Sequence, residues 1–259
     1  MESTEERAHR NLCDFIRWSG RLHAGTPVLD ERGVVAYAGP VDFPSEHVAI
    51  RSDASLPASE WAAAVDRFFA EHGRSSCVFA RVGIDDDVRE ALGAHAFREW
   101  STSPEMVCDA PLEASEPPAG FTVRLASTPA DISAYARIAA EAFGHLHMTE
   151  EAVLDTVDRP GAFLADDCVV ALAETDGVPV AGAQVLLFGA SRGAYVSWVS
   201  CADSARGHGL GDTVTRTVTN EAFARGATLV TLEASPFGEH TYARMGYREI
   251  YRYRTLLRM

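Results

Sequence analysis

The sequence predicts an α/β fold in which helices flank a mixed central sheet, and it predicts this fold twice in tandem. Strand-like apolar runs alternate with amphipathic helical segments in the second half of the chain, residues 121–259. A glycine-rich hexamer, residues 206–211, lies between a strand-like run and a helix-like run. The first half has a similar order of elements, and a four-residue motif of the second half recurs in it.

The second half is expected to run β-α-α-β-β-β-α-β-α-β. Its first helix should be capped by Ser127 or Thr128 and should stop at Gly144. A hairpin is expected at Asp176-Gly177, because this dipeptide lies between two apolar runs. Strands are expected at residues 121–125, 168–174, 178–188, 194–201, 228–233 and 247–257, and helices at residues 129–143, 149–157, 212–225 and 237–245.

The first half has weaker signals in a comparable order. The motif Ala96-Phe97-Arg98-Glu99 matches Gly246-Tyr247-Arg248-Glu249, which lies 150 positions later. This echo and the shared order favour a duplicated domain. Helices are expected at residues 8–22, 57–72 and 85–95, and strands at residues 33–38, 47–52, 77–82 and up to Cys108.

The segment 111–120 is rich in Pro, Ala and Glu and has no periodicity, so it is the predicted linker. The predicted domains are therefore residues 1–110 and residues 121–259. Two tryptophans, Trp61 and Trp198, are expected to be core residues and not platforms for a ligand.

Composition limits the possible functions. The net charge is -14 at pH 7, which argues against a general affinity for nucleic acid or for an anionic membrane. No stretch is long and apolar enough to span a bilayer, and the first residues lack an apolar signal region, so a cytoplasmic protein is expected. The five cysteines are scattered without a CxxC pair, which predicts reduced thiols and no metal site.

The hexamer Arg206-Gly207-His208-Gly209-Leu210-Gly211 suits an anion. A helix N-terminus has unpaired backbone N–H groups and the positive end of the helix dipole. Glycine lets a ligand approach the backbone closely, although such hexamers can also be simple turns. The spacing fits neither a P-loop nor a dinucleotide-binding fingerprint. A phosphate-bearing cofactor other than a nucleoside triphosphate or NAD is therefore expected.

Together these features resemble the GNAT superfamily of N-acetyltransferases. The acyl-CoA signature of that family is Arg or Gln, two residues, Gly, one residue, then Gly or Ala, and residues 206–211 fit it. The family also has a Tyr four residues before a Gly-aromatic pair, which Tyr242 and Gly246-Tyr247 match. The resemblance covers residues 121–259 well and residues 1–110 as a diverged copy. It implies an acetyl-CoA-dependent N-acetyltransferase that acts on a primary amine of a small molecule or a peptide.

The resemblance assigns residues to acetyl-CoA and none to a metal. The loop at Arg206 would hold the pyrophosphate, and Asp212 would open the following helix. The strand before the loop would splay from its neighbour and pair with the pantetheine arm, and one of its N–H groups would face the thioester carbonyl. The expected cofactor-binding residues are Val199, Ser200, Cys201, Arg206, Gly207, His208, Gly209, Leu210, Gly211 and Asp212.

For catalysis, the resemblance implies that Tyr242 protonates the leaving thiolate and that the acetyl group passes directly to the amine. Tyr242 could instead be a core aromatic. The general base stays open, because the strand at residues 195–201 contains no acid where many family members have a Glu.

Glu233, His145, His147 and a water are alternatives for the base. Glu141 and the two histidines are also expected acceptor contacts. Each has a purely structural alternative, since Glu233 could be a strand-end charge and the histidines could be solvated loop residues.

The first copy lacks both signature motifs. At the offset of 150, residues 56–61 lie opposite the hexamer and Leu92 lies opposite Tyr242. We therefore expect one active site per chain, with the first half shaping the acceptor cleft or mediating packing. The missing strand Glu favours an alternative function, an acyl-CoA-binding regulatory or assembly module without turnover.

Overall fold

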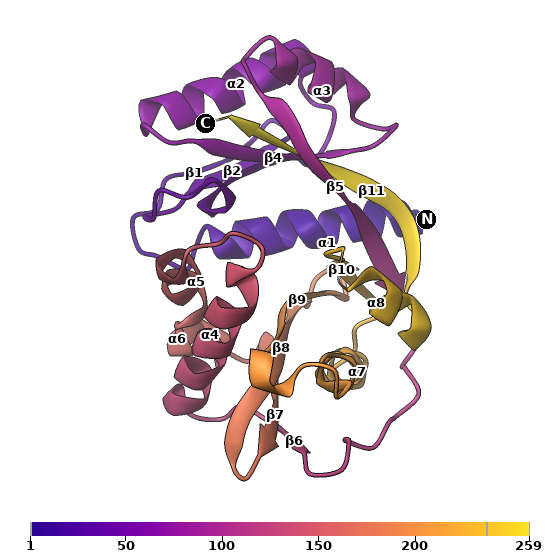
Figure 1. Cartoon of the computed structure of the whole chain (residues 1–259). Coiled ribbons are helices and arrows are strands. Elements are labelled where there is room, and N and C mark those ends of the chain that lie inside the picture. The colour runs from indigo at the N-terminus through magenta and orange to yellow at the C-terminus, as the bar shows by residue number, and fades with distance from the viewer. Residues whose placement is uncertain (1, 237, 259) are drawn as a thin grey trace. The chain divides into compact units, whose positions relative to one another are not determined.

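The computed structural model describes residues 2–236 and 238–258, and their contacts define two compact units (Figure 1). Unit 1 is Met1–Glu105, Ala234–Pro236 and Glu249–Met259. Unit 2 is Met106–Glu233 and Phe237–Arg248. The C-terminal strand of the chain therefore lies almost entirely in unit 1.

In unit 1, helices cover both faces of a mixed sheet. Its strands follow in the order β1-β2-β3-β4-β11-β5. Helix α1 packs on one face, and α2 and α3 pack on the other (Figure 1). The elements are α1 (Thr4–Ser19), β1 (Val28–Glu31), β2 (Val34–Ala38), the 3₁₀ turn η1 (Pro44–Glu46), β3 (His47–Arg51), α2 (Ala58–Glu71), β4 (Ser76–Arg81), α3 (Asp86–Gly93), β5 (Arg98–Cys108) and β11 (Arg248–Arg258).

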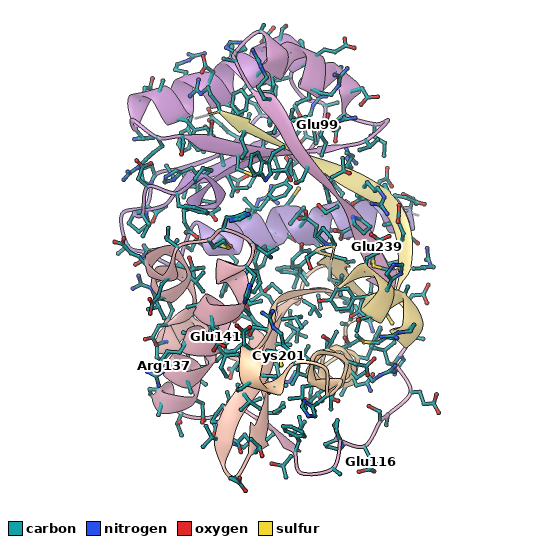
Figure 2. All side chains as sticks on the ribbon, in the orientation of Figure 1. Glu99, Glu116, Arg137, Glu141, Cys201 and Glu239 are labelled. Carbon is teal, nitrogen blue, oxygen red and sulfur yellow. The ribbon has the colours of Figure 1, made fainter. Side chains whose placement is uncertain are left out.

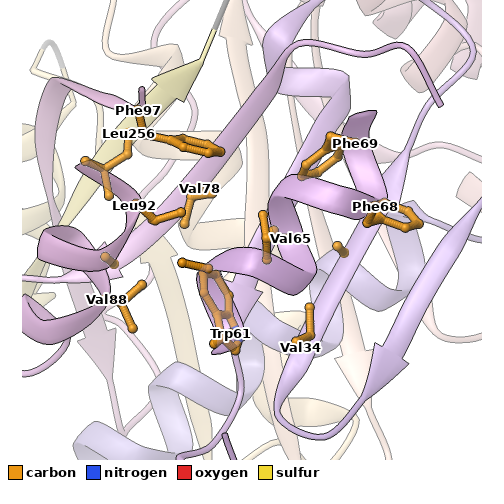
Figure 3. Close-up of a cluster of buried hydrophobic side chains, with 14 of the residues drawn as sticks. Val34, Trp61, Val65, Phe68, Phe69, Val78, Val88, Leu92, Phe97 and Leu256 are labelled. Carbon is orange, nitrogen blue, oxygen red and sulfur yellow. The ribbon is translucent and has the colours of Figure 1, made fainter. Parts of the chain in front are cut away.

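The core of unit 1 lies between α2 and the sheet (Figure 3). Trp61 is fully buried there, and its indole N–H donates to the carbonyl of Gly33 at 3.0 Å. The prediction that Trp61 is a core residue is therefore confirmed. Leu256 of β11 belongs to the same cluster, so the end of the chain contributes to this core.

A buried histidine ties three elements of unit 1 together. The His9 Nε2 lies 2.7 Å from the carbonyl of Arg51, which can only accept, so Nε2 carries the proton. The Nδ1 then accepts from the hydroxyl of Tyr253 at 2.8 Å. Burial, followed by the charge of Arg81, lowers the pKa of His9 to about 4. Neutral His9 thus links α1 to β3 and β11.

In unit 2, the strands follow in the order β6-β7-β8-β9-β10. Helices α4 and α7 cover opposite faces of these strands (Figure 1). The elements are β6 (Thr122–Leu125), α4 (Pro129–Gly144), α5 (Glu150–Val157), α6 (Pro160–Phe163), β7 (Cys168–Thr175), β8 (Val178–Phe188), β9 (Gly193–Cys201), the 3₁₀ turn η2 (Asp203–Ala205), α7 (Leu210–Ala224), β10 (Leu229–Glu233) and α8 (Glu239–Met245).

The two halves of the chain repeat one pairing pattern. Strands β1, β2 and β3 are antiparallel neighbours, and β3 runs parallel to β4 after the crossover helix α2. Strands β7, β8 and β9 are likewise antiparallel, and β9 runs parallel to β10 after α7. A helix and a strand follow in each case, α3 with β5 and α8 with β11. The predicted α/β fold in two tandem copies is confirmed.

Turn chemistry behaves largely as the sequence indicates. Asp176 and Gly177 have φ values of 51° and 74°, as a tight hairpin turn requires. Thr128, and not Ser127, caps α4 by accepting from the N–H of Asp131. Gly144 is the last residue of that helix and does not stop it, because His145 forms the cap.

Some expected boundaries are corrected. Helix α7 begins at Leu210 and not at Asp212, because Gly209 already ends the loop with a φ of 79°. Helix α8 begins at Glu239, and its expected first residue, Phe237, lies outside the described residues. Two short elements, β1 and α6, were not predicted.

The segment 111–120 contains no helix or strand. It is nevertheless attached to α7, because Leu112 exchanges two hydrogen bonds with the side chain of Asn220, at 2.8 and 3.1 Å. We still propose this segment as the connection between the two copies.

Candidate active site

Strands β9 and β10 separate within unit 2. Their register covers only Gly193 to Tyr195 on β9, although β9 continues to Cys201 and β10 continues to Glu233. In the part of the chain that the structure describes, residues 196–201 have no register partner on β10. We call this opening, formed by residues 196–201 and 232–233, the fork. The expected splay is present, and Val199, Ser200 and Cys201 lie along it.

Strand β9 also carries a bulge at the fork. Gly182 pairs with Ser200 and Gln184 pairs with Ser197, so β9 has one residue more than β8 over this stretch. Trp198 has a φ of 54°, which is rare for a bulky side chain. Its half-buried ring packs on Phe143 of α4, with ring centroids 4.8 Å apart. This packing agrees with a structural role for Trp198.

Ser200 has a buried hydroxyl group beside the bulge. Its side chain is 3% exposed, and no described residue forms a hydrogen bond with its Oγ. Buried hydroxyls usually have a partner, so such a group beside an opening indicates a place for a ligand atom. Sequence reasoning assigned only the backbone of Ser200 to the cofactor.

The glycine loop ends at the N-terminus of α7. Gly207 and Gly209 have φ values of 81° and 79°. A Cβ atom added to Gly207, Gly209 or Gly211 would meet nothing within 4 Å, so the backbone is open to a ligand. Among the described residues, the N–H groups of residues 207–212 have no hydrogen-bond acceptor. These features fit a pyrophosphate group.

Three side chains of the loop are engaged within the protein. The His208 Nδ1 lies 3.2 and 3.1 Å from the carbonyls of Ala205 and Arg206. The buried Leu210 anchors the start of α7. The Asp212 carboxylate accepts from Arg216 at 2.6 Å, so only its backbone N–H is available to an anion.

One carboxylate joins two expected site residues. The His145 Nε2 lies 3.1 and 3.2 Å from the two Asp203 carboxylate oxygens, and the Arg206 guanidinium lies 3.0 Å from one of them. The Glu141 carboxylate accepts from the N–H of Asp203 at 2.7 Å. These contacts attach the end of α4 to the loop that leads into the glycine motif. Because the side chains are about half exposed, the pairs add little stability.

Cys201 ends the strand of the fork close to this cluster. Figure 2 labels its side chain and that of Glu141 on α4. Burial raises the pKa of the Cys201 thiol, so it stays protonated and behaves as a packing residue.

The Tyr242 side chain of α8 packs tightly against Gly238 and Tyr247. A Cβ atom on Gly238 would lie 2.6 Å from its ring, so glycine is needed there. The ring packs edge-on against Tyr247, with centroids 6.2 Å apart, and the Tyr247 hydroxyl lies 2.7 Å from that of Thr219. Burial raises the pKa of Tyr242 to about 12. Its phenol therefore remains a hydrogen-bond donor at neutral pH.

The other two candidate bases, His147 and Glu233, form no hydrogen bond with Asp203 among the described residues. His147 is exposed in the turn after α4, with a φ of 65°, and no hydrogen bond or ion pair joins its side chain to Asp203 within the described residues. Glu233 is half-buried at the end of β10, where its N–H donates to the Tyr195 hydroxyl at 3.2 Å. The structure thus brings His145, but not His147, to the Asp203 cluster.

Sequence reasoning missed Asp203, Tyr135 and Gly238. Asp203 could have been noticed as an acid three residues before Arg206, a spacing at which side chains of one turn meet. Tyr135 and Gly238 had no comparable signal, since their roles depend on contacts between distant segments.

The segment of the first copy opposite the glycine loop is filled by side chains. Leu56 and Trp61 are buried there, and the Arg51 guanidinium donates to the carbonyl of Leu56 at 2.9 Å. Helix α2 begins after Pro57 without any glycine. This helix N-terminus differs from that of α7 in both sequence and surroundings.

The five cysteines are free, and four of them are buried. Within residues 2–236 and 238–258, no group of three or more His, Cys, Asp or Glu side chains could hold a metal ion. No helix in the described parts of the chain is both long enough and apolar enough to cross a membrane.

The site thus consists of an open glycine loop at the N-terminus of α7 and a fork between the parallel strands β9 and β10. Residues 131–247 match the model of the Acetyltransferase (GNAT) family. Residues 131–247 are therefore similar to the GNAT acetyltransferase family. A comparison with curated protein sequences gave no match.

Solved structures show the same fold. A GCN5-related N-acetyltransferase from Kribbella flavida is 22% identical with a TM-score of 0.75, over 96% of this chain and 95% of that one. A GCN5-related N-acetyltransferase from Sphaerobacter thermophilus is 17% identical with a TM-score of 0.64, over 89% and 82%. A tandem GNAT protein from the clavulanic acid biosynthesis pathway is 14% identical with a TM-score of 0.58, over 87% and 78%.

Proposed function

We propose that the protein is an acetyl-CoA-dependent N-acetyltransferase that transfers an acetyl group directly to a primary amine of a small molecule or a peptide. One observation carries the proposal. The fork between β9 and β10 leads into a loop whose N–H groups, residues 207–212, have no acceptor among the described residues. The GNAT family match over residues 131–247 supports the same chemistry.

The chain supplies three kinds of contact to the cofactor. The N–H groups of residues 207–212 and the Arg206 guanidinium hold the pyrophosphate. The backbone of residues 199–201 pairs with the pantetheine amides along the fork. Bound acetyl-CoA supplies a thioester, whose carbonyl carbon accepts the amine and whose sulfur leaves.

Tyr242 donates to the departing sulfur. A phenol with a pKa of about 12 would protonate an exposed thiolate poorly. Burial raises the pKa of a thiol as well, as it does for Cys168, so desolvation of the site favours transfer of the Tyr242 proton to the departing sulfur.

We assign the general base to His145. Its hydrogen bond to Asp203 fixes the orientation of the ring, as in other His-carboxylate pairs. The base removes one proton from the amine as the N–C bond forms and the C–S bond breaks. Tyr242 donates its hydroxyl proton to the departing sulfur, which gives free CoA. Glu233 is the alternative base.

The base is tested by two matched variants. His145→Ala should lower kcat by about tenfold to a hundredfold with unchanged CoA affinity, as loss of a general base does. Glu233→Gln should leave kcat nearly unchanged. The reverse pattern would transfer the role to Glu233, and equal activity of both variants would assign proton removal to water.

A second candidate function is an acyl-CoA-binding module without turnover. The absence of any acid from residues 193–201 favours it. Acetyl-CoA is incubated with a panel of primary amines that includes polyamines, aminoglycosides and basic peptides, and thiol release is measured. Release that depends on one amine supports the transferase. Calorimetric binding of CoA without release for any amine supports the module.

A further inference from the structure

The bulge of β9 is held from α4 at two points. Tyr135 and Phe143 lie two turns apart on the same face of α4. The Tyr135 hydroxyl donates to the backbone carbonyl of Trp198 at 2.8 Å, and the Phe143 ring packs on the Trp198 indole. One contact therefore holds the backbone of the bulged residue, and the other holds its side chain.

The bulge needs such support. A residue with a Cβ rarely adopts a φ of 54°, and a bulky one persists there only where its surroundings hold it. The Trp198 carbonyl is the group that moves if the peptide relaxes. The hydrogen bond from Tyr135 acts directly on that carbonyl.

Tyr135 is suited to a permanent contact. Its side chain is fully buried, and burial raises the pKa of the phenol well above its usual value, so the hydroxyl stays protonated. Its ring lies against β8 at Gly182, where a Cβ atom would come within 2.6 Å of the ring. Gly182 is the register partner of Ser200, so the ring lies beside the bulge because that position has no side chain.

We propose that Tyr135 is a positioning residue whose hydroxyl fixes the peptide between Trp198 and Val199. In a trans peptide the carbonyl and the following N–H point in opposite directions. A Trp198 carbonyl held toward α4 thus directs the Val199 N–H away from α4, and Val199 lies in the stretch of β9 that forms the fork. This N–H is the donor to the thioester carbonyl, and the inference rests on the proposed transferase function.

A cycle of variants tests the proposal. Tyr135→Phe should lower kcat by about tenfold or more, because a misdirected backbone donor loses its effect on the transition state. CoA affinity should change less than about twofold, since the pyrophosphate loop is untouched. Glycine adopts positive φ without strain, so in a Trp198→Gly background the bulge no longer needs the hydroxyl. There, Tyr135→Phe should change kcat less than about twofold.

Equal losses of kcat in the two backgrounds, or no loss in the first, would overturn the proposal. A measurement without turnover separates it from the proposed function. Amide hydrogen exchange at Trp198 and Val199 should be faster in Tyr135→Phe than in the wild type, while exchange at Val185 of β8 stays the same. Unchanged exchange at the bulge would overturn the proposal whether or not the wild type acetylates an amine.

Discussion

The hydroxyl of Tyr195 accepts a hydrogen bond from the backbone N–H of Glu233 at 3.2 Å, at the point where β9 and β10 separate. Tyr195 is the last residue of β9 in register with β10, where it pairs with Thr231. A side chain from one strand therefore binds the backbone of the other just beyond their last shared position. This contact marks the closed end of the fork.

Tyr195→Phe should loosen the fork. Loss of a buried hydrogen bond should lower the free energy of unfolding by about 1 kcal/mol. CoA affinity should fall by roughly threefold to fivefold, because the end of β10 gains freedom that binding must remove. Thermal unfolding and calorimetry with CoA measure the two effects. A lower melting temperature with unchanged CoA affinity would show that the contact serves stability alone.

Gly209→Ala should weaken CoA binding by about tenfold, since an alanine at a φ of 79° is strained by about 1 to 2 kcal/mol. Gly211→Ala is the matched variant, because Gly211 lies within α7 and is not at positive φ. If only Gly209→Ala binds weakly, loop conformation is decisive. If both variants bind CoA weakly, the open space beside the loop backbone is decisive. Calorimetry should also give one site per chain, and unchanged binding in both variants would contradict the anion site.

Tyr242→Phe should lower kcat by about a hundredfold while CoA affinity stays within about twofold, as expected for a lost proton donor. Tyr247→Phe is the control, because it removes a neighbouring hydroxyl that bonds to Thr219. The control should lose stability and keep its kcat. Steady-state kinetics with a fixed amine measures both. Equal kcat values for Tyr242→Phe and the wild type would leave Tyr242 as a core aromatic.

His9 should make stability depend on pH. Its folded pKa of about 4 lies below the ordinary value of 6.5, so the unfolded chain binds more protons between these values. The contribution of neutral His9 is complete above pH 6.5 and is lost as the pH falls toward 4. It is on the order of 1 to 3 kcal/mol.

The His9 contribution is measured against His9→Gln, which cannot titrate. Urea unfolding at about pH 7 and about pH 4.5 should show a larger loss of stability for the wild type. The other titrating groups are common to both proteins and cancel in the difference. The same loss in both proteins would contradict a neutral buried His9.

The order of elements could be predicted because the apolar pattern differs in period between helix and strand. Residues 129–143 follow the helical period, and the expected helix became α4 with a shift of one residue at its end. The glycine loop could be predicted because Gly207 and Gly209 occupy positive φ, which few other residues adopt. In both cases the structure depends on residues that are close together in the sequence.

What could not be predicted depends on distant partners. The pairing of β11 with β4 joins residues far apart in the sequence, and no local pattern specifies it. The bulge at Trp198 had no signal, because a tryptophan is among the last residues expected at positive φ. Only the contacts from Tyr135 and Phe143 explain it. Local signals thus predicted the glycine loop but not the support of the bulge.

The most direct test of the account combines acetyl-CoA, the purified protein and a panel of primary amines, with thiol release and product mass measured together. An N-acetyltransferase should give free CoA and acetylated amine in equal amounts for at least one amine, and both products should be lost in Tyr242→Phe. Binding of acetyl-CoA without thiol release for any amine would contradict the proposed function and would leave a binding module.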